Sequence, residues 1–271
     1  MLFSIIIPTF ERRQVLPRSI DSSVAFARVA GETEIVVVDD ASRDGTAAMI
    51  RDRYAPQLAS GSVKLVERRI NGGVTAARND GARAAHGDWL IFLDSDDQLL
   101  PIASQAIPAF AARYNTSRIL FFRCEDETGS LIGSVAAGGP LDLDTLLTRG
   151  TPGECLPVLS RTAFLAHPYD EDLRGFEYLA YLRIVRAHGP AMLSETVVRR
   201  YATTGADRLS TLAGRLQRAD LMARGFARMR AEFGGTLGFW RQGALVLRLV
   251  CYRLAAMGGF GRQSLRQPVK Q

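Results

Sequence analysis

One short stretch of the chain restricts its fold more than any other. An apolar run at residues 89–93 is followed at once by an acidic cluster, Asp94, Asp96 and Asp97. A short, continuous apolar run is typical of a strand that is buried on both faces of a parallel sheet. The carboxylates would then lie at the carboxyl end of that strand, the edge where open α/β sheets bind their ligands.

The acidic cluster has two interpretations. Three carboxylates within four residues repel one another, and a divalent cation would offset that repulsion. Mg²⁺ is usually held by one or two carboxylates together with substrate phosphates. The stretch therefore predicts either a metal–diphosphate site or a solvated acidic turn before a helix that begins near Pro101.

The first hundred residues alternate between apolar runs and helical patterns. Buried strands are expected at residues 3–7, 34–38, 63–66 and 89–93, and helices at 15–30, 46–54 and 74–85. This alternation predicts βαβ units and a doubly wound, mostly parallel sheet, which is the Rossmann-like α/β class.

Polar residues follow all four predicted strands. They are Thr9 and Glu11, Asp39 and Asp40, Arg68 and Arg69, and the acidic cluster at 94–97. Parallel strands end at the same edge of a sheet, so we expect these side chains to lie close together. Several polar strand ends at one edge are typical of a binding site, and this favours the metal–diphosphate interpretation.

The second hundred residues mix strands and short helices. A strand is expected at 118–124 with a hairpin partner at 131–135, later strands at 156–159 and 197–201, and a helix that opens at 175.

Arginine and apolar residues alternate at helical spacing after residue 211. A helix is expected near 216–229 and a second over 237–257, and the second holds Arg241, Arg248 and Arg253. These charges make the second helix a poor candidate for a membrane span. The helices are expected either to lie on an anionic membrane surface or to pack on the rest of the chain or on a second subunit.

The formal charge of +6 comes almost entirely from arginine and favours an anionic partner, such as a nucleotide or a lipid phosphate. No basic patch is interleaved with aromatic residues, which argues against nucleic acid. The three cysteines are scattered and odd in number, as in proteins of reducing compartments. With no signal-peptide pattern and no membrane-spanning apolar run in the sequence, we expect a cytoplasmic protein.

Taken together and in order, these motifs resemble those of the family 2 inverting glycosyltransferases with the GT-A fold, over about residues 3–210. The matching segments are residues 4–12, 34–42, 71–73, 77–81, 87–89 and 93–97. Each segment alone is a weak signal, whereas their shared order and spacing are specific.

The resemblance implies a nucleotide-sugar site at the strand ends. Its expected contacts are Pro8, Thr9, Glu11, Asp39, Asp40, Asn71, Gly73, Arg78, Asp94, Ser95 and Asp96. Asp94 and Asp96 match the DxD motif of the family, which implies that Asp96, together with Asp94, holds Mn²⁺ or Mg²⁺. The resemblance also implies diphosphate or acceptor contacts for Asp97, Arg183 and Arg208.

The family usually has an acidic pair at the start of a later helix, and the second acid is the general base. Here the matching pair is Phe176 and Glu177. A phenylalanine therefore replaces the first acid, and the implied base is a glutamate rather than the more common aspartate.

The implied activity is transfer of a sugar from a UDP- or GDP-type donor to a saccharide or a lipid-linked acceptor, in cell-surface or exopolysaccharide assembly. The expected domains are a glycosyltransferase domain at 1–211, with a nucleotide half near 1–100 and an acceptor half near 101–211, and C-terminal helices at 212–271. A peripheral position on the inner membrane face and a homodimer are further expectations.

Two other functions are considered. A nucleotidyltransferase also uses an α/β sheet and carboxylate-held Mg²⁺, but the loop at 8–13 lacks the glycines that such enzymes usually carry after the first strand. A non-catalytic nucleotide-binding protein on the same fold would explain the altered pair at Phe176 and Glu177.

Overall fold

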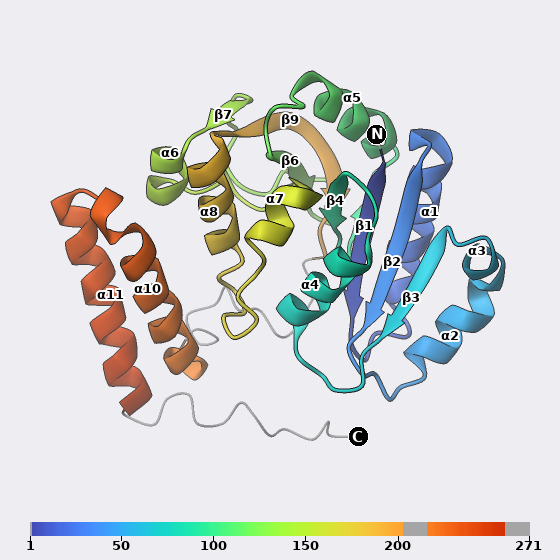
Figure 1. Cartoon of the computed structure of the whole chain (residues 1–271), viewed down its shortest axis with the longest axis horizontal. Helices are drawn as coiled ribbons and strands as arrows, with labels where there is room; N and C mark the ends of the chain where they lie inside the picture. Colours follow the sequence, from blue (N-terminus) through green and yellow to red (C-terminus); the bar gives the residue numbers. More distant parts are fainter. Residues whose placement is uncertain (1, 203–215, 258–271) are drawn as a thin grey trace. The chain divides into compact units, whose positions relative to one another are not determined.

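The computed structural model describes residues 2–202 and 216–257 (Figure 1). The chain divides into two compact units. The sheet unit comprises residues 1–171 and 180–203, and the helical unit comprises residues 172–179 and 204–271. The domain boundary expected between residues 211 and 212 lies outside the described residues.

Nine strands among the described residues form one sheet, in the order β3-β2-β1-β4-β8-β6-β9-β5, with β7 beside β9. The first four strands in this order are parallel: β1 (Phe3–Thr9), β2 (Thr33–Asp39), β3 (Val63–Glu67) and β4 (Trp89–Phe92). The predicted βαβ alternation and mostly parallel α/β sheet are therefore confirmed for this half of the sheet.

Strand β8 (Cys155–Ser160) changes the direction of the sheet, because it runs antiparallel to both β4 and β6 (Ile119–Glu125). Strand β9 (Ala191–Arg200) is parallel to β6 and antiparallel to β5 (Gln98–Leu99) and β7 (Gly139–Leu141). Since β5 follows the acidic cluster directly, its pairing with β9 connects the cluster to the far half of the sheet.

Helices cover both faces of the sheet (Figure 1). Their bounds are α1 (Leu16–Ala30), α2 (Thr46–Arg53), α3 (Ala55–Ala59), α4 (Val74–Ala84), α5 (Ala103–Arg113), α6 (Leu143–Thr148), α7 (Arg161–Ala166) and α8 (Tyr178–His188). The face that carries Ile5 packs against α1 and α5. Successive side chains of a strand point to opposite faces, so neighbouring Ile6 meets α4, where a Cβ on Gly81 would lie 2.4 Å from its methyl carbon.

Two predictions for the second half were wrong. Residues 131–135 are not a hairpin strand: Leu131 forms an isolated bridge to Glu125, Ile132 is only partly buried against the core, and Val135 is 91% exposed. Strand β9 begins at Ala191 rather than at 197. The sequence pattern did not reveal the first half of the strand, because that half includes polar residues such as the exposed Glu195.

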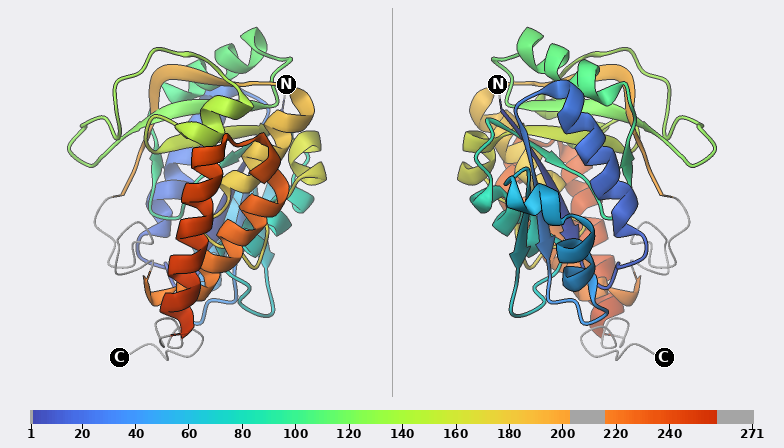
Figure 2. Two further views of the ribbon diagram at one scale, coloured as in Figure 1. Left: turned by 90° about the vertical axis from the view of Figure 1, so that its left-hand side faces the viewer. Right: turned by 90° about the vertical axis from the view of Figure 1, so that its right-hand side faces the viewer.

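The described part of the helical unit contains a hairpin of two helices, α10 (Ala219–Phe233) and α11 (Phe239–Met257), joined by the 3₁₀ turn η1 (Gly234–Thr236). Figure 2 shows α10 and α11 side by side. Phe226 of α10 stacks on Tyr252 of α11 at 5.7 Å between ring centroids, and Phe176 meets the same Phe226 edge-on at 5.4 Å. A Cβ on Gly225 would lie 2.2 Å from the Phe176 ring, so only glycine allows this approach.

Among residues 2–202 and 216–257, no helix combines the length and apolar character needed to cross a membrane.

Candidate nucleotide and metal site

The carboxyl ends of the parallel strands are joined by backbone hydrogen bonds. The N–H of Asp40, just beyond β2, donates to the carbonyl of Thr9 at the end of β1, at 2.8 Å. The N–H of Arg68, just beyond β3, donates to the carbonyl of Asp39 at 2.9 Å. The predicted convergence of polar residues at one edge is therefore present for β1, β2 and β3.

Asp40 is a buried carboxylate that holds the loop before α4. Its two oxygens accept the N–H groups of Gly72 at 2.9 Å and Gly73 at 2.7 Å, and it also pairs with the Arg68 guanidinium. Arg68 in turn donates to Asp80 on α4 at 2.7 Å. Asp40 thus shapes the loop that contains the predicted contacts Asn71 and Gly73; whether it also contacts a nucleotide stays a prediction.

Two loops beside β1 and β2 brace each other. The Glu11 N–H donates to the Ser42 hydroxyl at 2.9 Å, and the Glu11 carboxylate accepts the N–H of Arg43 at 2.7 Å. Ser42 in turn donates to buried Asp39, whose pKa is raised by burial. Pro8 is buried within β1.

The same two loops contain the two non-glycine residues with positive φ among the described residues, Glu11 at 53° and Ala41 at 66°. Left-handed backbone conformations cost free energy in L-residues and occur frequently at binding sites. Sequence reasoning did not identify Ser42 and Arg43 as parts of this site, although the Asp-Asp-Ala-Ser sequence is a common turn pattern.

Arg78 connects α4 to the acidic cluster. Its guanidinium pairs with Asp94, and its charged carbon lies 6.0 Å from the centre of the Tyr169 ring. Neighbouring Asn79 donates to the backbone carbonyl of Tyr169 at 2.9 Å, so two successive residues of α4 contact Tyr169, one at its ring and one at its backbone. The predicted contacts Arg78 and Asp94 are thereby brought together.

Asp96 carries the least compensated charge of the cluster. Burial raises its pKa, the neighbouring Asp94 carboxylate raises it further, and Arg12 and Arg18 partly oppose the shift. Among the described residues the structure gives Asp96 no ion pair, whereas adjacent Ser95 is buried in the same loop. A second carboxylate nearby disfavours the charged form of Asp96, and a bound cation would offset that repulsion.

The described residues contain no group of three or more histidine, cysteine or acidic side chains arranged to hold a metal ion. The cluster offers two accessible carboxylates, Asp94 and Asp96. Two carboxylates suit a hard cation that completes its coordination with phosphate oxygens and water, so the donor set fits Mg²⁺ or Mn²⁺.

Asp97, the third carboxylate of the cluster, is only 1% exposed. One oxygen accepts the N–H of Ala202 at 2.9 Å, and the other lies 3.2 Å from the buried Arg199 guanidinium without hydrogen-bond geometry. Burial raises the pKa of Asp97 to about 7 despite the opposing charge of Arg199. Its expected contact with diphosphate or acceptor stays a prediction.

Arg199 is a residue that sequence reasoning missed. It donates to the Cys124 sulfur at 3.2 Å and to Glu154 at 3.0 Å, in addition to facing Asp97. Its signal in the sequence is an arginine within the apolar pattern of a strand, after Val198. A charged side chain in that position is rarely buried unless it is paired.

Three predicted residues remain: Glu177, Arg183 and Arg208. Glu177 immediately precedes α8, whose first turn it was expected to join, and it belongs to the helical unit with Phe176. Arg183 on α8 pairs with Asp170 at 2.7 Å within the sheet unit. Arg208 falls outside the described residues.

Residues 4–128 match the family model described as glycosyl transferase family 2. A PGL/p-HBAD biosynthesis glycosyltransferase of Mycobacterium tuberculosis is 35% identical over 152 residues, 55% of each chain. A poly(ribitol-phosphate) beta-glucosyltransferase of Bacillus spizizenii is 33% identical over 100 residues, 36% of this chain and 15% of that one. The chain thus spans about half the length of the mycobacterial relative.

Solved structures share the fold. The S. aureus TarS fragment 1–349 in complex with UDP-GlcNAc has a TM-score of 0.66 at 18% identity, covering 97% of this chain and 74% of that one. The mannosyltransferase PcManGT of Pyrobaculum calidifontis, in complex with GDP-Man and Mn²⁺, has a TM-score of 0.63 at 19% identity, covering 97% and 76%. At these identities the likeness shows the GT-A fold.

Proposed function

We propose that this chain, whose residues 4–128 match the model of glycosyl transferase family 2, is a member of that family and transfers a sugar from a nucleoside-diphosphate donor to an acceptor hydroxyl with inversion. The observation that carries the proposal is the polar edge of the parallel strands. There, buried Asp39 accepts a hydrogen bond from Ser42 in its own loop and buried Asp40 holds the loop before α4. Beside them lies the acidic cluster, in which burial and Asp94 disfavour the charged form of Asp96.

The donor nucleotide would bind between the loops that follow β1 and β2, in contact with Pro8, Thr9, Glu11 and Asp39. Their mutual hydrogen bonds support this role, because a pocket that is already ordered loses little entropy when a ligand binds. A UDP- or GDP-type donor is favoured by the complexes of TarS with UDP-GlcNAc and of PcManGT with GDP-Man.

Asp94 and Asp96 would hold a divalent cation, Mn²⁺ or Mg²⁺. When bound, such a cation neutralises charge on the leaving diphosphate. Arg78, held beside Asp94 by its ion pair, would add a second positive group for the same oxygens. Support for the metal comes from the fit of the two carboxylates and from the Mn²⁺ in the PcManGT complex.

Glu177 would act as the general base. Its carboxylate takes the proton of the acceptor hydroxyl. The hydroxyl oxygen then forms a bond to the anomeric carbon of the donor sugar, and the bond between the anomeric carbon and the diphosphate oxygen breaks in the same step. A single displacement of this kind inverts the anomeric centre. Support for Glu177 comes from the family motif, and Phe176 beside it is fixed by Phe226 and Gly225.

The acceptor is proposed to be a growing saccharide or a lipid-linked one, in cell-surface or exopolysaccharide assembly at the cytoplasmic face of the inner membrane. The names of relatives support this class, since they include PGL/p-HBAD, poly(ribitol-phosphate) and succinoglycan biosynthesis proteins.

The test is a screen of UDP- and GDP-sugars with Mn²⁺, following release of the nucleoside diphosphate. We expect one donor to be turned over by the wild type, with activity lost in Asp96→Asn and Glu177→Gln. Asp52→Asn, an exposed carboxylate on α2, is the matched control and should retain activity.

Full turnover in both variants would refute the assignment of Asp96 and Glu177 to the active site. Tight binding of a nucleoside diphosphate without turnover of any donor would instead support a non-catalytic binding protein, and release of pyrophosphate from a nucleoside triphosphate would support a nucleotidyltransferase.

A further inference from the structure

Helix α11 carries apolar side chains on two opposite faces. One face is buried within the helical unit and includes Leu245 and Leu249. The other, called the outer stripe, is exposed: Trp240 85%, Leu247 64%, Val250 44%, Leu254 62% and Met257 80%. Spacings of three, four and seven residues place these five side chains along one side of a helix.

Arginines border the outer stripe on both sides. At 100° per residue, Arg241 and Arg248 lie along one border between the two apolar faces, and Arg253 lies along the other. The helix contains no acidic residue. An apolar stripe with cations on both borders and an exposed tryptophan is the pattern of a helix that lies flat at a lipid surface.

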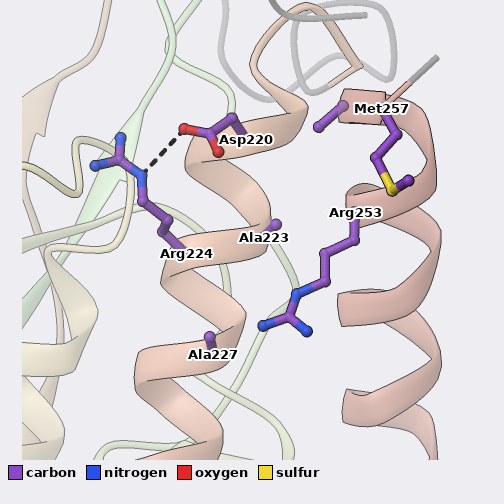
Figure 3. Close-up of a pocket in the computed structure, with 7 residues that line it drawn as sticks. Asp220, Ala223, Arg224, Ala227, Arg253 and Met257 are labelled. Atoms are coloured by element: carbon purple, nitrogen blue, oxygen red, sulfur yellow. Dashed lines mark ion pairs between the residues drawn. The ribbon is translucent and has the colours of Figure 1, made fainter. Parts of the chain in front are cut away.

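Arg253 is available to an anion. It lines a cavity of about 360 Å³ between α10 and α11, whose floor includes Ala223 and Ala227, and Figure 3 shows its guanidinium directed between the two helices. On the opposite wall Arg224 is already paired with Asp220 at 3.2 Å. The structure gives Arg253 no ion pair within the described residues, so its charge is not neutralised by an acidic side chain there.

We propose that the outer stripe and its bordering arginines dock on an anionic lipid surface, with α11 parallel to the membrane plane. Residues 216–257 contain seven arginines and only two acidic residues, Asp220 and Glu232. This charge is complementary to anionic headgroups, each of which attracts nearby basic residues.

The same charge disfavours a second copy of the chain as the occupant. Two outer stripes facing each other would bring the bordering arginines of both copies together without acidic partners on α11, and like charges at an interface oppose association. The docking we propose does not depend on sugar transfer, because it uses none of the residues assigned to the donor site.

The experiment is sedimentation of the full chain with phosphatidylcholine vesicles, prepared with and without phosphatidylglycerol. We expect binding to the anionic vesicles only, weakened by salt because exposed charges are screened. Leu247→Asp combined with Leu254→Asp should lower binding at least tenfold, since each leucine loses its burial in the lipid. The combined substitutions Arg241→Gln, Arg248→Gln and Arg253→Gln should abolish the preference for phosphatidylglycerol.

Val135→Asp is the matched control, an exposed apolar residue of the sheet unit, and should bind as the wild type does. Because all these positions are exposed, thermal melting should show unchanged folding. Equal binding to both kinds of vesicle, or undiminished binding by the leucine variant, overturns the proposal. It is also overturned if light scattering shows a wild-type dimer that Leu247→Asp and Leu254→Asp convert to a monomer. Loss of donor turnover does not bear on these outcomes.

Discussion

The buried carboxylate of Glu34 should make folding strongly pH-dependent. It lies near the start of β2, at the amino ends of the parallel strands. Its oxygens accept hydrogen bonds from Ser4 Oγ at 2.6 Å, from Lys64 Nζ at 2.6 Å and from the backbone of His86 and Gly87. Glu34 therefore joins β1, β2, β3 and the segment before β4.

Burial alone would raise the pKa of Glu34, but the hydrogen bonds from Lys64, Ser4 and His86 outweigh it and lower the pKa from 4.5 to about 2. A shift of this size corresponds to about 3 kcal/mol of differential stability at neutral pH. Because the folded-state pKa is the lower one, this stability is fully present above the unfolded value and is lost as the pH falls toward about 2.

We expect Glu34→Gln to lower the free energy of unfolding by roughly 3 kcal/mol near pH 7. Urea denaturation of both proteins between neutral and acid pH measures the difference, which should shrink steadily through the window from 4.5 to about 2. Asp52→Asn, which removes an exposed carboxylate, is the matched control and should leave the free energy of unfolding near pH 7 unchanged. A difference between wild type and Glu34→Gln that stays constant with pH would refute the reasoning.

Three other predictions concern the site and the helical unit. Arg199→Gln leaves Asp97 buried without its cation and should lower the free energy of unfolding, measured by urea denaturation, by roughly 3–5 kcal/mol. Arg199→Lys should recover part of this loss, and equal losses in both variants would contradict the reasoning. Gly225→Ala places a methyl group against the Phe176 ring and should lower the free energy of unfolding by roughly 1–3 kcal/mol, seen as a lower melting temperature. An unchanged melting temperature would show that the ring moves freely. EDTA should abolish donor turnover, and Mn²⁺ should restore it in the wild type but not in Asp96→Asn; turnover that persists in EDTA would argue against metal dependence.

The parallel half of the fold could be predicted from the sequence because its strands are buried on both faces. Residues 35–38 and 89–93 are uninterrupted apolar runs, and the helices between the strands follow helical spacing. The antiparallel half was harder to predict. Strand β9 mixes buried with partly buried residues without a regular alternation, and the two-residue β5 is defined by its partner rather than by its own sequence.

The gathering of polar residues at the strand ends could be predicted from the sequence, but the contacts among them could not. Asp40 was identified by its position after a strand, yet its bonds to Gly72 and Gly73 depend on a loop more than thirty residues away. Arg199 reaches Asp97 across the pairing of β5 with β9. Such long-range pairings cannot be read from local patterns, because they depend on which strands become neighbours.

The order of strands has a practical consequence for anyone dividing this protein. The family model ends at residue 128, whereas β4 needs β8 on its open side and β6 needs both β8 and β9. A fragment cut at that boundary would carry two hydrophobic strands with exposed backbone edges, which are sites of aggregation. A soluble fragment for crystallisation or binding work should therefore extend at least through β9.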